Sequence, residues 1–161
     1  MGVVEDRIAA KGLTLPPPLT PPPGMALPFP WVNVRGDRAF VSGHGPQGED
    51  GSYCPPFGRV GAEVTVEQGA ELARRVALGM VASLKRELGE LDRVTGWCKV
   101  LGMVNAAPGF TETPSVINGF SHLILELFGP EIGRHSRSAV GMAALPAGFA
   151  VEIEAEVMIA P

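Results

Sequence analysis

The strongest helical pattern in the chain begins at Thr65. Apolar side chains then recur every three or four residues, with charged side chains between them, as far as Gly89. Thr65 and Gln68 have the spacing of a capping box, in which each side chain bonds to the backbone N–H of the other. The pattern predicts an amphipathic helix that ends at Gly89, because glycine is common just after helix C-termini.

A second amphipathic helix is predicted from Thr113. This residue is the expected N-cap, and Pro114 lies in the first turn, where proline is tolerated. The apolar positions of this helix are Ile117, Phe120, Ile124 and Leu127. We expect the helix to end before Gly129 and Pro130, since both residues interrupt helices.

Shorter apolar segments predict a sheet. Residues 31–35 and 38–42 flank an Arg-Gly-Asp-Arg turn and predict a β-hairpin, and residues 94–105, 138–144 and 149–159 have the pattern of further strands. Two long helices can cover only one face of such a sheet, so the order of elements predicts an α+β fold. The other face would be left bare, and burying it against copies of the same chain predicts a homo-oligomer.

The N-terminal segment has a different character. Residues 3–11 predict a short helix that ends at Gly12, and residues 13–30 hold half of the sixteen prolines. Consecutive prolines predict an extended strap. We interpret it as a spacer that lays the first helix over the domain, and a ligand for an aromatic groove is the alternative. The predicted division is residues 1–27 for helix and strap and residues 28–161 for the main domain.

Composition narrows the possible functions. The chain has 161 residues with a net charge of −4, so it lacks the broad positive field of a nucleic-acid-binding protein. Two cysteines cannot build a disulfide framework, and no spacing typical of a metal site occurs. The N-terminus is acidic and lacks the features of a signal peptide, and no apolar run could span a membrane. We therefore expect a cytoplasmic protein without a metal.

Two polar clusters could carry chemistry. Residues 134–138 read Arg-His-Ser-Arg-Ser, which could clamp a carboxylate or phosphate through the guanidinium groups, although a solvated loop is the simpler interpretation. Glu152, Glu154 and Glu156 alternate along a predicted strand and therefore share one face. That face is either solvated or part of a cleft that contains arginine.

Other candidates have weaker patterns. Ser42, Gly43 and His44 lie at a strand end, before a long loop over residues 43–61, but they lack the full Gly-x-Ser-x-Gly pattern of a nucleophile turn. Asn118 and His122 share one face of the second helix, where they could form the edge of a ligand site or a polar surface.

The C-terminal residues carry a resemblance to a known family. The segment Arg137-Ser-Ala-Val-Gly-Met-Ala-Ala-Leu-Pro146, followed by Val151-Glu-Ile-Glu-Ala155, resembles the RidA/YjgF family of imine and enamine deaminases, which is also called the endoribonuclease L-PSP family. The Ser42–Gly43 turn and Asn118 are similar as well. The resemblance covers residues 28–161 and implies a chorismate-mutase-like fold, with a mixed, mostly antiparallel sheet and two long helices on one face. It also implies a homotrimer with clefts between subunits.

The resemblance further implies a cofactor-free reaction, the hydrolysis of 2-imino or enamine acids to 2-keto acids and ammonia. By analogy, Arg137 holds the substrate carboxylate and Glu152 activates the attacking water. Ser42, Gly43 and Asn118 would line the cleft.

The chain also departs from this family. Phe29 stands where deaminases of the family have a tyrosine, and Ala139 stands where they have a cysteine; both positions would also line the cleft. These departures favour an alternative, a binding module that captures small carboxylates such as keto acids without turnover. A ribonuclease is a third and weaker hypothesis, because the net charge is negative.

Overall fold

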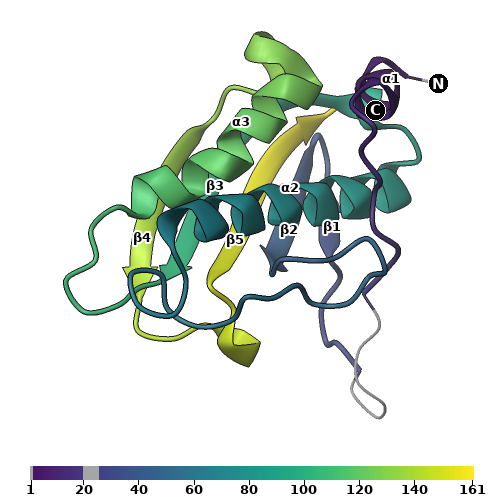
Figure 1. Cartoon of the computed structure of the whole chain (residues 1–161). Helices are drawn as coiled ribbons and strands as arrows, with labels where there is room; N and C mark the ends of the chain where they lie inside the picture. Colours follow the sequence, from purple (N-terminus) through teal and green to yellow (C-terminus); the bar gives the residue numbers. More distant parts are fainter. Residues whose placement is uncertain (1, 20–25) are drawn as a thin grey trace.

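The computed structural model describes residues 2–19 and 26–161. It contains the following helices and strands in chain order: α1 (Val3–Ala10), β1 (Val32–Arg35), β2 (Arg38–His44), α2 (Val66–Leu88), the 3₁₀ turn η1 (Leu91–Arg93), β3 (Val94–Asn105), α3 (Thr113–Ile132), β4 (Ser136–Met142), η2 (Pro146–Gly148) and β5 (Val151–Ile159). The fold is α+β, as the pattern of helices and strands predicts (Figure 1).

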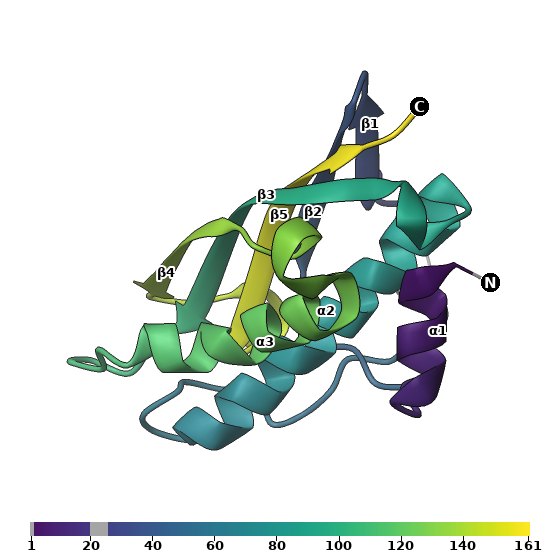
Figure 2. The ribbon, with the colours of Figure 1, turned by 90° about the horizontal axis from the view of Figure 1, so that it is seen from above.

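The five strands form one sheet in the order β1-β2-β5-β3-β4. All neighbouring pairs are antiparallel except β3 and β4, which run parallel. The long helices α2 and α3 lie side by side across one face, and the view from above shows that none of the described helices lies on the other face (Figure 2). The mixed, mostly antiparallel sheet with a bare face is therefore confirmed.

Strand β5 shows how the sequence creates these two faces. Val151, Ile153 and Val157 are fully buried against the helices, whereas Glu152 and Glu154 alternate with them on the bare face. The bare face is also apolar in part, because the exposed large side chains of the sheet strands are Phe40, Val140, Met142 and Met158. Exposed apolar area of this kind is typical of an interface, and the homo-oligomer remains a prediction.

The two long helices match their sequence patterns to different degrees. In α2 the capping box is present, with the Gln68 N–H donating to Thr65 Oγ1 over 3.1 Å and the Thr65 N–H donating to Gln68 Oε1 over 2.9 Å. The prediction that Thr113 caps α3 is wrong, because Glu112 is the N-cap residue. The Thr113 hydroxyl instead donates to the Ala139 carbonyl, over 3.0 Å, and ties the start of α3 to β4.

The predicted end of the second helix is confirmed, whereas the start of one strand moves. The regular turns of α3 end before Gly129, whose φ of 80° and ψ of 170° are not helical, and a separate short turn from Pro130 extends the element to Ile132 after this kink. Strand β4 begins at Ser136 and not at Ser138, since Ser136 already pairs with Lys99 of β3. Long-range pairing thus extends the strand into a segment with a polar sequence.

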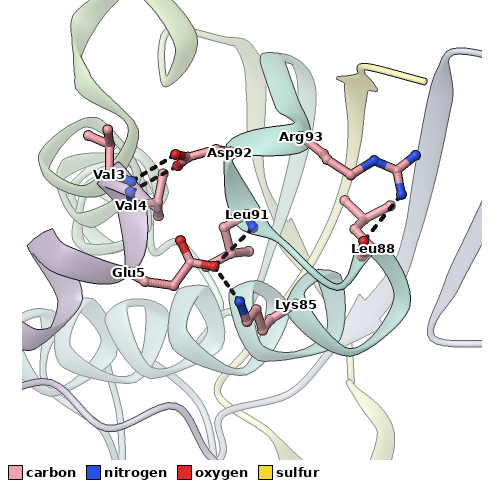
Figure 3. A network of polar contacts seen from close by, with 8 residues as sticks. All are labelled: Val3, Val4, Glu5, Lys85, Leu88, Leu91, Asp92 and Arg93. Atoms are coloured by element: carbon pink, nitrogen blue, oxygen red, sulfur yellow. Dashed lines mark hydrogen bonds and ion pairs between the residues drawn. The ribbon is translucent and has the colours of Figure 1, made fainter. Parts of the chain in front are cut away.

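The predicted N-terminal helix is present and anchored by side chains of the main domain (Figure 3). The Asp92 carboxylate accepts hydrogen bonds from the N–H groups of Val3 and Val4 at 2.7 and 3.0 Å. Glu5 of α1 accepts from the Leu91 N–H at 3.1 Å and pairs with Lys85 of α2. A helix of 8 residues is not stable alone in water, so these contacts hold it in place.

The described part of the proline strap lies against the main domain. The Pro16 carbonyl accepts a hydrogen bond from Arg86 of α2 at 3.1 Å, and the Pro17 carbonyl accepts one from Gln47 at 2.8 Å. These contacts favour the interpretation of the strap as a spacer that lies over the domain. The prolines at positions 21–23 lie outside the described residues, and the division at residue 27 remains a prediction.

Candidate functional site

Strand β4 carries Arg137 at the edge of the sheet, on the helix side. Arg137 pairs with Val100 of β3, whose side chain is in the core beneath the helices. Its guanidinium donates to Asn118 Oδ1 at 2.7 Å, to Ser121 Oγ at 3.0 Å and to the Pro114 carbonyl at 3.2 Å. The structure therefore brings together two residues that the sequence singled out separately, Arg137 and Asn118.

The guanidinium of Arg137 opens into a cavity of about 330 Å³. The cavity is lined by Asn118, Ser121, His122, Leu125, Arg134, His135 and Arg137. Burial lowers the pKa of Arg137, but a guanidinium remains charged at any physiological pH. With two arginines and no carboxylate in its lining, the cavity favours an anionic ligand.

Glu152 of β5 lies on the bare face of the sheet. It is half-buried beside Gly43 of β2, where a Cβ would overlap Oε1 of Glu152, so the glycine leaves room for this carboxylate. Burial raises the pKa of Glu152, and the neighbouring charge of Glu154 raises it further. A carboxyl group with a raised pKa is suited to take and return protons near neutral pH.

The sequence patterns did not single out Tyr53, which lies in the long loop after β2. Its ring contacts Phe149 edge-on, with 4.5 Å between the ring centroids. Burial raises the pKa of Tyr53, and the charge of Glu152 raises it further. The Tyr53 hydroxyl is therefore near enough to Glu152 for the two groups to interact electrostatically. Tyr53 is the single tyrosine of the chain, which is the one sequence signal that could have drawn attention to it.

Phe29 and Ser42 lie in a second cavity, of about 450 Å³, on the bare face. Its lining comprises Phe29, Pro30, Asn33, Phe40, Val41, Ser42, Lys99, Leu101, Glu154, Ala155 and Glu156. The Ser42 hydroxyl donates to the Pro30 carbonyl at 2.8 Å. Ala139 lies away from this cavity, on the helix side of β4, where its carbonyl accepts from Thr113.

The key residues Arg137 and Glu152 point to opposite sides of the sheet within one chain. Arg137 pairs with Val100, which faces the helices, and Glu152 pairs with Met103, three residues further along β3 on the bare face. Since side chains alternate along a strand, an odd separation puts the two residues on opposite faces. One chain alone therefore cannot bring the guanidinium and the carboxylate to the same small ligand.

His44 does not form a catalytic pair with Ser42. Its Nδ1 donates to the Ser42 carbonyl at 2.6 Å, and its Nε2 accepts from the Ser83 hydroxyl of α2 at 2.9 Å. The Ser83 oxygen in turn accepts from Arg86 at 3.0 Å. This buried chain of hydrogen bonds joins the end of β2 to the helix layer, so His44 has a structural role.

The burial of His44 predicts a pH dependence of stability. Burial lowers the pKa of His44 from 6.5 to about 4, so between these values the unfolded chain binds a proton that the folded chain does not. Stability should therefore fall as the pH falls through this range, and His44 should lower the free energy of unfolding by about 2 kcal/mol between pH 7 and pH 5. Urea titrations of the wild type and of His44→Gln at both pH values measure this difference. An identical pH dependence in the two proteins would contradict the prediction.

Residues 2–19 and 26–161 contain no group of three or more histidine, cysteine, aspartate or glutamate side chains that could hold a metal ion. Over the same ranges, no helix is both long and apolar enough to cross a membrane.

Comparison with known proteins identifies the family. The family model described as "YjgF/chorismate_mutase-like, putative endoribonuclease" matches residues 5–151. The chain belongs to the YjgF family. The resemblance and the chorismate-mutase-like fold inferred from the sequence are thereby confirmed.

Several proteins are similar to this YjgF-family chain. Protein TCP17 of Trypanosoma cruzi is 41% identical over 157 residues, which are 95% of this chain and 94% of TCP17. The crystal structure of Atu1372 from Agrobacterium tumefaciens, a protein of unknown function, is 36% identical with a TM-score of 0.84, covering 98% of this chain and 92% of that one. TdcF of E. coli with bound serine shares the fold, at 19% identity and a TM-score of 0.59, covering 86% of this chain and 93% of TdcF.

Proposed function

We propose that this YjgF-family protein hydrolyses small 2-imino acids or their enamine tautomers to 2-keto acids and ammonia. The site would be shared between neighbouring copies in a homotrimer, with Arg137 of one copy facing Glu152 of the next. The observation that carries the proposal is the guanidinium of Arg137, fixed by Asn118 at 2.7 Å in a cavity without carboxylates. The fold neighbour TdcF supports it, since the serine bound to that protein also carries a carboxylate.

Binding of the substrate carboxylate would be the task of Arg137. A guanidinium has five N–H donors, and three hydrogen bonds to Asn118, Ser121 and Pro114 leave two donors for a ligand. Charge-assisted bonds of this kind are about twice as strong as neutral ones. The carboxylate would therefore orient the imine carbon toward the neighbouring copy.

Glu152 would act on water in the chemical step. Its carboxylate removes a proton as the water oxygen bonds to the imine carbon, and it passes this proton to the nitrogen to give a neutral carbinolamine. Glu152 then takes the hydroxyl proton of the carbinolamine and delivers it to the nitrogen, so that the carbonyl forms as the C–N bond breaks and ammonia leaves. Water and imine supply all the atoms of the products, so an oriented water and one acid–base group suffice.

A coupled assay tests the proposed reaction. An amino-acid oxidase generates 2-iminobutanoate or 2-iminopropanoate, and semicarbazide traps the imine that remains. Wild-type protein should reduce the amount of trapped imine in proportion to its concentration. An unchanged yield of the trapped product, with folded and oligomeric protein, would rule out the deaminase.

The variant Arg137→Ala tests whether Arg137 binds the carboxylate of the substrate. Loss of a charge-assisted contact of about 2–3 kcal/mol should raise the KM about 30- to 100-fold. The matched control is Arg35→Ala, because Arg35 is exposed on β1 and does not line this cavity. Equal KM values for Arg137→Ala and the wild type would refute the role of Arg137.

A binding module for small carboxylates is the second candidate, and Phe29 favours it. Phe29 lines the bare-face cavity with a ring that has no hydroxyl, so it offers no proton donor there. In this case 2-oxobutanoate would bind to the wild type and not to Arg137→Ala, without turnover of any imine.

Ribonuclease activity is the weakest candidate, because three glutamates share the bare face.

A further inference from the structure

We infer that Ser121 and His135 are positioning residues that hold the guanidinium of Arg137 in its binding orientation. The inference rests on the proposed function, because it names the residues that position Arg137, and the proposed function assigns carboxylate binding to Arg137. Neither residue is expected to touch the substrate in the reacting position. Their effect should therefore appear in affinity and not in the chemical step.

A chain of three hydrogen bonds leads from the guanidinium to the backbone. Arg137 Nη1 donates to Ser121 Oγ at 3.0 Å, Ser121 Oγ lies 2.9 Å from His135 Nε2, and His135 Nδ1 lies 2.7 Å from the Gly133 carbonyl oxygen. The chain ends at the turn that joins α3 to β4. Ser121 thus comes from α3 and Arg137 from β4, and His135 lies in the turn between these two elements.

For a neutral imidazole, only one arrangement of protons satisfies this chain. A carbonyl oxygen can only accept, so His135 Nδ1 must carry the single ring proton, and Nε2 is then the acceptor. The Ser121 hydroxyl then donates its proton to Nε2, and the lone pairs of the Ser121 oxygen remain free to accept from Arg137. A neutral His135 with a defined tautomer therefore directs the serine oxygen toward the guanidinium.

The surroundings keep His135 neutral. Burial lowers the pKa of His135, and the nearby charge of Arg137 lowers it further. The ring packs edge-on against Phe120, with 6.2 Å between the centroids. Ser121 is also buried, so its hydroxyl has little access to water as a substitute partner if the imidazole is removed.

Positioning matters here because arginine is long and flexible. An arginine that samples many rotamers must be ordered when the carboxylate binds, whereas one already held in place loses less freedom. Asn118 and Ser121 lie three residues apart on α3, on the same helical face, and grip the guanidinium at two of its nitrogens. His135 completes this grip by fixing the direction of the serine hydroxyl.

Calorimetric titration with 2-oxobutanoate and imine kinetics test the inference together. Ser121→Ala and His135→Phe should each raise the Kd of 2-oxobutanoate and the KM about 10-fold, with kcat unchanged. His135→Gln should restore the Kd to within about threefold of wild type, because its amide oxygen can accept from Ser121. Ser115→Ala is the matched control, since Ser115 lies on the same helix but is exposed and does not line the cavity, and it should bind like the wild type.

The outcomes separate this inference from the proposed function. If Arg137→Ala binds 2-oxobutanoate as well as the wild type does, Arg137 does not bind the carboxylate, and the proposed function fails. If Arg137→Ala loses binding while Ser121→Ala and His135→Phe keep it, only the positioning role fails. Long-range ¹H–¹⁵N spectra of the unmodified protein give an independent check, and an Nε2–H tautomer for His135 would overturn the inference even if the variants do not fold.

Discussion

Replacing Glu152 with glutamine should lower the kcat for imine hydrolysis by about 10²- to 10⁴-fold, the range that general acid–base catalysis supplies. Glutamine has nearly the same shape as glutamate and should fit the space beside Gly43, but it cannot take the proton from water. The KM should change little, because the carboxylate of the substrate is held by Arg137. Steady-state kinetics of both proteins in the semicarbazide assay measure the effect.

A control for this variant lies on the same strand. Glu156 shares the bare face with Glu152 but pairs with Arg38 of β2, so Glu156→Gln should keep the kcat of the wild type. If Glu152→Gln also kept it, Glu152 could not be the base. Equal losses in Glu152→Gln and Glu156→Gln would point instead to a general effect of charge on the bare face.

The pH profile adds a second test of Glu152. The base must be ionised, so kcat/KM should fall on the acid side, with a midpoint above the ordinary glutamate pKa because burial raises the pKa of Glu152. The charge of Glu154 raises this pKa further, so Glu154→Gln should move the midpoint to lower pH. If Glu154→Gln leaves the midpoint unchanged, a group other than Glu152 causes the loss of kcat/KM at low pH.

The sequence patterns predicted features that depend on near neighbours. The α2 capping box and the alternation of glutamates in β5 need only residues close in the chain, and both are present. Thr113 is not the cap because the helix starts one residue earlier than expected, so that Thr113 is its first residue, and its hydroxyl donates to the Ala139 carbonyl of β4. That carbonyl comes from a parallel strand 26 residues away, which no local pattern reveals.

The same distinction applies to the candidate site. The family motif identified Arg137 and Glu152, but their orientation depends on how β4 and β5 pair with β3. One residue of shift in the β3–β4 register would turn Arg137 to the bare face. The sequence patterns singled out His135 only as part of the cluster 134–138 and did not single out Ser121, since their link to Arg137 forms only when α3 packs against β4.

The opposite orientations of Arg137 and Glu152 predict that two inactive variants should restore activity when they share an oligomer. In the proposed homotrimer, each site takes Arg137 from one copy and Glu152 from its neighbour. Each mixed trimer of Arg137→Ala and Glu152→Gln chains would have about a third of its sites with both residues intact, because only one of its three neighbour contacts joins an intact arginine to an intact glutamate. Coexpression of the two differently tagged variants, with purification through both tags, yields the mixed oligomers for the assay.

Two controls accompany the complementation experiment. The two variants purified apart and mixed briefly in the native state should stay near their own low activities, because subunits have not exchanged. Coexpressed Arg137→Ala and Glu156→Gln chains should show the activity expected from the intact arginines alone, since Glu156 pairs with Arg38 and has no assigned role in the site. If the mixed Arg137→Ala and Glu152→Gln oligomers stay inactive while both tags are recovered together, the shared site is wrong. A monomer by light scattering at micromolar concentration would lead to the same conclusion, because the two residues cannot meet within one chain.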